Sequence, residues 1–388
     1  MKKHRFTIIA TILALVAAIV TWQLYNPTPQ QNDTKTSPTK IVRIGAILPL
    51  TDTYAYYGTN ESLGLRLALE DVKNEFKQSE INIELLLEDS KAAPKIGVTA
   101  ANKLISQQNA RFIITSLTGV SRAVSPLVIE AGAAQVMFTM DESLADLKNG
   151  IIRIYPGIRE EGHALVRAIV EASVKSCDIV HFEQAAINGQ VRDVLLPEFS
   201  ARSITTSRIE PFRTTTPLSL SAIAATIKDT GSDCLVVNAY YSQLPVVLKI
   251  LHEHGALDGK KIFSGFNLGV AAISKMLPEG LPVITTAMPA GYSRNTKTER
   301  FRTLSARAAS EGQKLSIDVV YAYDAMRMLC RAIHNTGGDP KAVAAALTQM
   351  SYPNSVSGIS GIDATGSSVT AWETLFIKSN FIMTDEQE

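Results

Sequence analysis

Short apolar runs rich in β-branched residues alternate with stretches of helical periodicity along most of this chain, and this alternation constrains the fold more than any other feature. In the first helical stretch Leu65, Leu69 and Val72 recur at three- and four-residue steps, which gives the helix one apolar face. Strands that alternate with helices predict βαβ units and a parallel sheet. The expected strands of this first series are 42–50, 81–89, 111–116 and 135–140, with helices beginning near residues 60, 94 and 120.

A second series of the same kind begins near residue 151 and predicts a second α/β domain. Two open parallel sheets predict two lobes, and ligands of such sheets bind beyond the carboxyl ends of the strands. The loops at those ends are therefore the first place to look for a site. The expected strands of this series are 151–156, 178–182, 207–212, 233–240 and 260–266, followed by a strand-like run at 283–292, helices near 298–311 and 317–335, and a strand at 373–379.

Composition and charge limit the kinds of partner. The chain has 388 residues, of which 46% are hydrophobic and 19% are charged, and this length suffices for two domains of ordinary size. Lys and Arg number 38 against 37 for Asp and Glu, so no field of one sign covers the surface. We therefore expect no nucleic acid partner, and no attraction to anionic lipid through overall charge.

The start of the sequence predicts export. Basic residues at positions 2, 3 and 5 precede an apolar stretch from Phe6 to about Tyr25, which is roughly long enough to span a bilayer as a helix. Cleavage at the small residues 16–18 would leave an apolar mature end, so residues 1–25 are expected to stay as a membrane anchor with the rest of the chain in the periplasm. Residues 26–40 are rich in Pro, Thr, Asn and Gln and predict a flexible tether.

The three cysteines, Cys177, Cys234 and Cys330, form no CxxC pair and lie in apolar surroundings. An odd number of cysteines in such surroundings favours buried free thiols over a disulfide framework, even in an oxidising compartment. No cysteine precedes Cys177, which excludes a lipoprotein anchor.

Motifs of catalysis and phosphate binding are missing: the sequence has no GxGxxG after a strand, no GxxxxGK[ST], no HExxH and no GxSxG. His252 and His254 stand two residues apart on an expected helix, so they diverge and are unsuited to hold one metal ion. Glu88 and Asp89 follow a strand, where a carboxylate pair more often caps a helix or faces solvent. We therefore expect a protein that is not an enzyme and that needs no metal or other cofactor.

The stretch RIGAILPLTDTYAYYGTNESLGLRLALEDVK, residues 43–73, resembles the opening of the type I periplasmic solute-binding proteins, specifically the leucine/isoleucine/valine-binding family that serves ABC importers. The matching features include the spacing of Tyr57-Gly58 and Gly64, the IEAG run at 129–132 and the AYDA run at 322–325. The resemblance extends from about residue 42 to residue 379, and it depends on the order and spacing of these runs together.

This resemblance implies an α/β fold of the periplasmic-binding-protein type I, with two Rossmann-like lobes whose parallel sheets are joined by three crossovers around a ligand cleft. It assigns residues 41–156 and 285–355 to lobe 1, and residues 157–284 and 356–388 to lobe 2. In this family a small solute binds in the cleft, the lobes close over it, and the closed form docks on a permease. We therefore expect a solute-binding protein of an ABC importer for an amino acid or a related small polar metabolite. A membrane-tethered ligand-sensing module of the same fold, without a transport role, is the alternative.

In lobe 1 the resemblance implies ligand contacts at the strand ends. Tyr57 matches a position in the pocket wall of the family. The hydroxyl that grips the ligand carboxylate falls at Gly119, although Thr118 and Ser121 flank it, and backbone N–H groups at a helix start can still bind an anion.

Ser143 matches a hydroxyl that contacts the amino acid, and Asp141 falls where a backbone carbonyl receives the ammonium group. The Asp141 side chain either strengthens that ammonium subsite or caps the following helix. In lobe 2 Tyr240 matches a tyrosine that faces the ligand, whereas the aromatic residue expected near Asn188 is absent and the acidic residue expected near Asn267 is an amide. Either Asp141 compensates for these losses, or the ligand is not a simple α-amino acid.

Overall fold

The computed structural model describes residues 15–18, 21, 22, 25, 40–241, 243–269, 271–291, 298–352, 354–378 and 381–383. The chain from Lys40 onward forms one compact unit, distinct from residues 1–39. Most of the segment expected to be a membrane anchor lies outside the described residues, as does nearly all of the expected tether. Within the described part of the chain, no helix combines the length and the apolar character needed to cross a bilayer. The anchor and the tether therefore stay predictions from the sequence.

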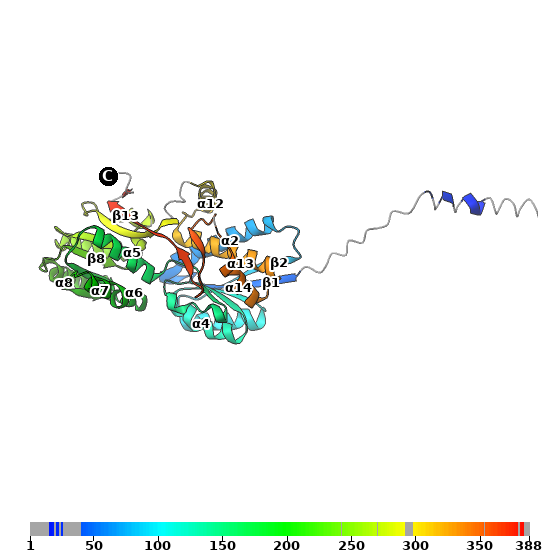
Figure 1. Ribbon diagram of the computed structural model, residues 1–388, viewed down its shortest axis with the longest axis horizontal. Helices are drawn as coiled ribbons and strands as arrows, with labels where there is room; N and C mark the ends of the chain where they lie inside the picture. The colour runs from blue at the N-terminus through cyan, green and yellow to red at the C-terminus, as the bar shows by residue number, and fades with distance from the viewer. Residues whose placement is uncertain are drawn as a thin grey trace, which may run out of the picture. The chain divides into compact units, whose positions relative to one another are not determined.

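The first sheet has five strands that all run parallel, as the alternating pattern predicts. Their order is β2-β1-β3-β4-β5, and Figure 1 labels β1 and β2. Alternate residues of each strand face opposite sides, so Ile44 and Ile114 pack with α2 and α13, whereas Ile47 and Ile113 pack with α3 and α4. Bounds are β1 Lys40–Leu48, α2 Ala55–Glu75, β2 Ile81–Asp89, α3 Pro94–Asn102, β3 Phe112–Ser116, α4 Thr118–Glu130, β4 Ala134–Phe138, β5 Ile151–Arg153, α12 Glu299–Ser310, α13 Ile317–Thr336 and α14 Pro340–Gln349.

The second sheet has seven strands in the order β14-β13-β10-β9-β8-β6-β7, in which β13 and β14 run antiparallel to their neighbours. Residues of α5 and α7 cover one face and residues of α8 and α9 cover the other. Bounds are α5 Ile158–Glu171, β6 Cys177–Phe182, α6 Ala185–Gln190, α7 Leu196–Ala201, β7 Ile209–Phe212, α8 Pro217–Lys228, β8 Cys234–Asn238, α9 Leu244–Glu253, β9 Lys261–Ser264, α10 Ala271–Ser274, β10 Ile284–Pro289, β13 Trp372–Lys378 and β14 Phe381–Met383.

Three crossovers join the two sheets: from β5 to α5, from β10 to α12, and from the hairpin of β11 (Ile359–Ile362) and β12 (Ser368–Thr370) to β13. The two α/β lobes expected from the sequence are thus confirmed, but two boundaries differ. The hairpin of β11 and β12 falls in the range 356–388 expected for lobe 2, yet β11 packs on α14 of lobe 1. Strand β10 falls in the range 285–355 expected for lobe 1, yet in the second sheet it lies between β9 and β13 and pairs with both of them. The second crossover therefore begins only after Pro289.

Arg153, the last residue of β5, is fully buried where two crossovers approach each other. Its backbone N–H donates to the carbonyl of Gly366 over 2.8 Å, and its Nε donates to Ser367 Oγ over 3.2 Å. The guanidinium also donates to the carbonyl of Tyr155 in the first crossover. Burial lowers the pKa of Arg153, although nearby carboxylates such as that of Glu142 oppose this effect. These bonds fasten the first crossover to the segment that leads into the third.

The expectation of free thiols is wrong for two of the three cysteines. Cys177 on β6 and Cys234 on β8 form a disulfide, whereas Cys330 in α13 is a buried free thiol. The two strands are neighbours, and their parallel register sets Cys177 opposite Cys234 with a Cα–Cα distance of 4.5 Å. The sequence separation of 57 residues conceals this register, because strand order within a sheet is not visible in the pattern of strands along the chain.

Candidate functional site

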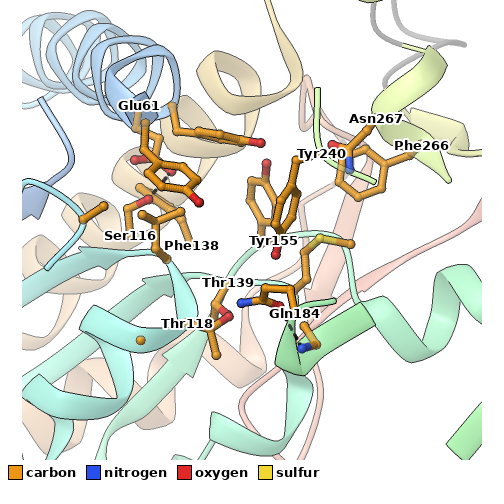
Figure 2. A pocket seen from close by; sticks show the side chains of 17 residues that line it. Glu61, Ser116, Thr118, Phe138, Thr139, Tyr155, Gln184, Tyr240, Phe266 and Asn267 are labelled. Atoms are coloured by element: carbon orange, nitrogen blue, oxygen red, sulfur yellow. Dashed lines mark hydrogen bonds between the residues drawn. The ribbon is translucent and has the colours of Figure 1, made fainter. Parts of the chain in front are cut away.

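A cavity of about 220 Å³ lies at the carboxyl ends of strands from both sheets (Figure 2). Its walls are largely apolar, with several aromatic rings, and they carry a limited number of polar groups, which is the usual composition of a pocket for a small molecule. The lining residues are Tyr54, Tyr57, Glu61, Ala92, Ser116, Leu117, Thr118, Gly119, Phe138, Thr139, Met140, Tyr155, Gln184, Ala186, Tyr240, Phe266 and Asn267.

Tyr57 reaches the cavity from a helix and Tyr54 from the turn before it, whereas the sequence predicts a helix that begins only near residue 60. A short 3-10 turn from Asp52 to Tyr54 leads directly into α2, which therefore begins at Ala55 and includes Tyr57 in its first turn. Gly58 makes this early start possible, because a Cβ atom there would lie 2.2 Å from the carbonyl oxygen of Pro49. The helix thus begins in direct contact with the end of β1, with Tyr57 beside the cavity.

The next wall is the junction of β3 and α4. Leu117 has a φ of 68°, a conformation that costs free energy for a residue other than glycine and that occurs often at functional sites. It is followed by Thr118 and Gly119, which begin α4 and line the cavity. The first N–H groups of a helix have no acceptor inside the helix and can bind an anion. Thr118 Oγ1 also lies 2.7 Å from Thr139 Oγ1 at the end of β4, so two hydroxyls border the same position.

Glu61 brings a carboxyl group to the wall of lobe 1. Its side chain is 2% exposed, Oε1 accepts a hydrogen bond of 2.7 Å from Ser116 Oγ, and Oε2 is buried with no partner among the described residues. Burial raises the pKa of Glu61 well above its usual range, repulsion by the Asp318 carboxylate adds to this, and the bond from Ser116 opposes it. None of the described residues that line the cavity is Lys, Arg or His. The cavity therefore offers a ligand an acidic group and no cationic side chain.

Asp318 lies in the first turn of α13 and is fully buried. Its Oδ1 accepts a hydrogen bond of 2.6 Å from the hydroxyl of Tyr155, which lines the cavity. Burial raises the pKa of Asp318 to about 7, against the effect of the Tyr155 bond. The carboxyl group of Asp318, which does not itself line the cavity, thus fixes the position of the Tyr155 ring.

Close packing of α2 on α13 brings these acidic groups together. A Cβ atom at Gly64 would lie 2.3 Å from the carbonyl oxygen of Val319, so only glycine permits this approach. Val319 follows Asp318 directly, and Glu61 precedes Gly64 by three residues. The contact at Gly64 therefore sets Glu61 and Asp318 on facing helices beside the cavity.

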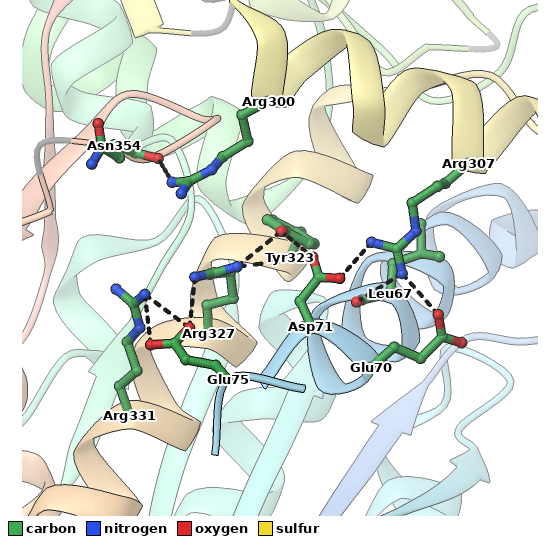
Figure 3. A network of polar contacts seen from close by, with 10 residues as sticks. All are labelled: Leu67, Glu70, Asp71, Glu75, Arg300, Arg307, Tyr323, Arg327, Arg331 and Asn354. Atoms are coloured by element: carbon green, nitrogen blue, oxygen red, sulfur yellow. Dashed lines mark hydrogen bonds and ion pairs between the residues drawn. The ribbon is translucent and has the colours of Figure 1, made fainter. Parts of the chain in front are cut away.

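Ion pairs fix the C-terminal half of α2 (Figure 3). Asp71 lies 2.7 Å from Arg307 of α12 and accepts a hydrogen bond from the Tyr323 hydroxyl. Glu75 pairs with Arg327 over 3.1 Å and with Arg331 over 2.9 Å, both from α13. These contacts join α2 to α12 and α13, so the helix that carries Tyr57 and Glu61 is fixed at both ends.

Lobe 2 supplies the opposite wall. Asn267 follows β9 and donates from Nδ2 to the carbonyl of Ala239 over 3.2 Å, which leaves its Oδ1 as the side-chain acceptor. Phe266 is fixed by its N–H, which donates to Glu161 over 2.7 Å. Burial raises the pKa of Tyr240 well above its usual range, and the nearby Tyr54 adds to this. Lobe 2 therefore presents aromatic rings and neutral polar groups to the ligand.

A second cavity of about 270 Å³ adjoins the first and shares Tyr54, Tyr57 and Tyr240 with it. Its lining also includes Tyr241, whose ring stacks on Tyr57 and meets Tyr56 edge to face with centroids 5.4 Å apart. The tyrosines of α2 and those that follow β8 thus make direct aromatic contact between the lobes.

Five of the residues predicted for the site line the first cavity, and the structure brings them together from both lobes. These are Tyr57, Thr118, Gly119, Tyr240 and Asn267. The other four predicted residues, Ser121, Asp141, Ser143 and Asn188, are not among the residues that line it.

Side-chain contacts explain the positions of three of those four, Ser121, Asp141 and Ser143. The Ser121 hydroxyl points into the core beneath α4, 2.9 Å from Thr115 Oγ1. Asp141 pairs with Arg122 over 2.8 Å and accepts both the N–H and the hydroxyl of Ser143, so it caps the short helix that follows. Asn188 lies one turn into α6, where its N–H donates to the carbonyl of Gln184. For Asp141, these contacts favour the capping of the following helix over a place in the ammonium subsite.

Sequence reasoning missed Glu61, Ser116, Thr139, Tyr155, Gln184 and Phe266. One signal was available for Glu61, because it falls on the same four-residue step as the buried Leu65 and Leu69. A carboxyl group on the apolar face of a helix is uncommon unless it has a partner or a function. Tyr155 and Gln184 gave no comparable signal, because their places depend on how the crossovers bring the two lobes together.

Comparisons with known proteins agree with this arrangement. The sequence profile of a periplasmic binding protein family matches residues 41–373. The Leu/Ile/Val-binding protein BraC3 of Rhizobium johnstonii is 26% identical over 320 residues, which cover 79% of this chain and 83% of that protein.

Solved structures show the same fold. A solute binding protein of an ABC transporter from R. palustris, in complex with 4-hydroxybenzoate, has a TM-score of 0.76 at 19% identity, covering 89% of this chain and 98% of that one. The branched-chain amino acid binding protein LivJ of Streptococcus pneumoniae, in complex with isoleucine, has a TM-score of 0.72 at 16% identity, with coverage of 89% and 98%.

Proposed function

Because the chain belongs to the periplasmic binding protein family and is of the Leu/Ile/Val-binding type, we propose that it is the extracytoplasmic solute-binding protein of an ABC importer. It traps an amino acid or a related small carboxylate metabolite by hinged closure of its lobes, delivers it to a permease and catalyses no reaction. The observation that carries the proposal is the cavity lined from both lobes. A ligand that contacts both lobes binds the closed form better than the open form, and this difference in affinity drives closure.

The chemistry of the cavity supports a carboxylate with an apolar body. The start of α4 at Thr118 and Gly119 offers backbone N–H groups to an anion, with the hydroxyls of Thr118 and Thr139 beside them. Aromatic rings such as Tyr57 and Phe266 offer flat apolar walls. Isoleucine and 4-hydroxybenzoate, the ligands of the two similar structures, both combine a carboxylate with an apolar body.

A thermal-shift screen of amino acids and aromatic carboxylates tests ligand binding. A true ligand at a hundred times its dissociation constant adds about 2.7 kcal/mol to the free energy of unfolding. The Tyr240→Ala variant is expected to lose most of this shift, whereas Leu218→Ala, at an exposed position on α8, retains it. A screen in which no compound of either class stabilises the protein contradicts the proposal.

Uptake measurements test delivery to a permease. Deletion of the gene is expected to abolish high-affinity uptake of the ligand found in the screen, and the wild-type gene restores it. Unchanged uptake combined with tight binding would instead support the ligand-sensing module as the function.

The proposed location rests on the N-terminal sequence alone. Basic residues followed by the apolar stretch from Phe6 to Tyr25 favour export with the segment kept as an inner-membrane anchor. The protein is then expected in the membrane fraction after an alkaline wash, and a chain that begins at Lys40 behind a cleavable export signal is expected in the periplasmic fluid. If expression of the full-length gene yields a protein in the periplasmic fluid that lacks residues 1–25, the anchor is contradicted.

A further inference from the structure

Glu61 is the one carboxylic acid among the described residues that line the first cavity. It lies one turn after Tyr57 on α2, and Figure 2 shows it beside Ser116 and Phe138 on the lobe 1 side. Ser116 occupies only Oε1, so the buried Oε2 has no hydrogen-bond partner among the described residues. An oxygen of this kind costs free energy unless it carries a proton or a ligand supplies a donor.

The surroundings of Glu61 indicate which donor would fit. Asp318, from α13, supplies a second buried carboxyl group beside it, while Tyr57 on its own helix and Tyr155 after β5 are neutral. In the part of the wall that the structure describes, no cationic side chain balances these two carboxyl groups. Aromatic rings beside a carboxylate stabilise a positive charge further through their electron-rich faces.

The two positions at which the sequence suggested an acidic partner for a ligand ammonium group do not supply a free anion. Asp141 is already paired with Arg122 and bonded to Ser143 outside the cavity. Asn267, where the resemblance implies an acid, is neutral and donates to Ala239. Glu61 therefore remains as the anionic partner for a positively charged ligand group.

We propose that Glu61 binds a positively charged amine of the ligand and makes the site selective for small amine-bearing carboxylates. The proposal rests on the proposed function and deepens it. The amine lies against lobe 1 at Glu61, and the ligand carboxylate lies at the start of α4. Glu61 acts as its carboxylate in the complex, so an acid that is protonated in the empty site passes its proton to the solvent as the ammonium group binds.

Matched ligand pairs that differ only in the amine test the proposal by calorimetry. Suitable pairs are L-leucine with 4-methylpentanoate, L-phenylalanine with 3-phenylpropanoate, and 4-(aminomethyl)benzoate with 4-methylbenzoate. The amine member of at least one pair is expected to bind roughly ten- to a hundredfold more tightly, the range of a charge-assisted hydrogen bond. The Glu61→Gln variant is expected to lose this preference and to change the affinity for the deaminated partner by less than about threefold.

Asp141→Asn is the matched control, because it also removes one carboxylate from lobe 1 but outside the cavity. This variant is expected to leave both affinities unchanged. Wild-type protein supplies a second readout that does not depend on the folding of a variant. Near pH 6, titrations in two buffers of different ionisation enthalpy are expected to show proton release when the amine member binds, and none for the deaminated partner.

The outcomes separate this inference from the proposed function. Equal affinity within every pair, or an amine preference that survives Glu61→Gln, overturns the role of Glu61 and leaves the solute-binding function intact. A lack of binding by all members of all pairs contradicts the proposed function and this inference with it.

Discussion

The rings of Tyr57 and Tyr241 stack on each other, with centroids 5.1 Å apart and an angle of 26° between the ring planes. Tyr57 belongs to α2 in lobe 1, and Tyr241 follows β8 in lobe 2, so the contact connects the lobes directly. Both residues border the cavity that adjoins the candidate site. The aromatic contact therefore exists only when the lobes are close together, and it contributes to the free energy of that state.

Tyr241→Leu is expected to weaken ligand binding by about two- to tenfold, because an aromatic pair contributes roughly 0.5–1.5 kcal/mol beyond its buried area. Calorimetric titration with the ligand found in the screen measures the effect. Leu218→Ala serves as the control at a surface position away from the contact. An affinity equal to that of the wild type would show that the stacked rings add nothing to closure.

Reduction of the Cys177–Cys234 disulfide is expected to lower the free energy of unfolding by about 2–4 kcal/mol, since the bond restricts the unfolded chain. Urea unfolding with and without a reductant measures this loss. The Cys177→Ala/Cys234→Ala double variant should be less stable than the oxidised wild type and should not respond to the reductant. A wild-type protein that is equally stable in both conditions would speak against a disulfide in the mature protein.

Gly64→Ala is expected to destabilise the protein by about 1–3 kcal/mol, because the new methyl group would press against the carbonyl of Val319 and force α2 away from α13. Thermal unfolding measures the loss. Gly189→Ala is the matched control: Gly189 is also helical, but the nearest atom to a Cβ there is 3.9 Å away, and alanine favours the helix. Equal stability of the two variants would contradict the account of the helix contact.

Asp318→Asn is expected to flatten the dependence of stability on pH. Burial raises the pKa of Asp318 to about 7 in the folded protein, against an ordinary value near 4 in the unfolded chain. Its contribution is therefore complete below about pH 4 and is lost as pH rises through about 7, by an amount on the order of 4 kcal/mol. Urea unfolding at pH 5 and pH 8 measures the change for each protein. If the variant loses as much stability between pH 5 and pH 8 as the wild type does, Asp318 is excluded as a cause of the pH dependence.

The sequence predicted most strands, most helices and the two lobes because periodicity reports which residues are buried, and this is a local property. It could not show that Cys177 lies opposite Cys234, since strand order and register arise from the whole sheet. The sequence also predicted a start of the first helix near residue 60, whereas α2 begins at Ala55. The Tyr-rich run has no helical periodicity, and the close contact of Gly58 with Pro49 is visible only in the structure. The apolar pattern contained Glu61, but only the folded structure shows that this residue lines a cavity and has one buried oxygen with no partner among the described residues.

The bonds of Arg153 have a consequence for the path of motion. One buried guanidinium group holds the first connection between the lobes against the segment that enters the third. A rotation that twists these two connections against each other would break hydrogen bonds in the interior, whereas a rotation about the line along which they meet preserves them. Sideways shear of these two connections against each other is therefore the displacement that this arginine resists.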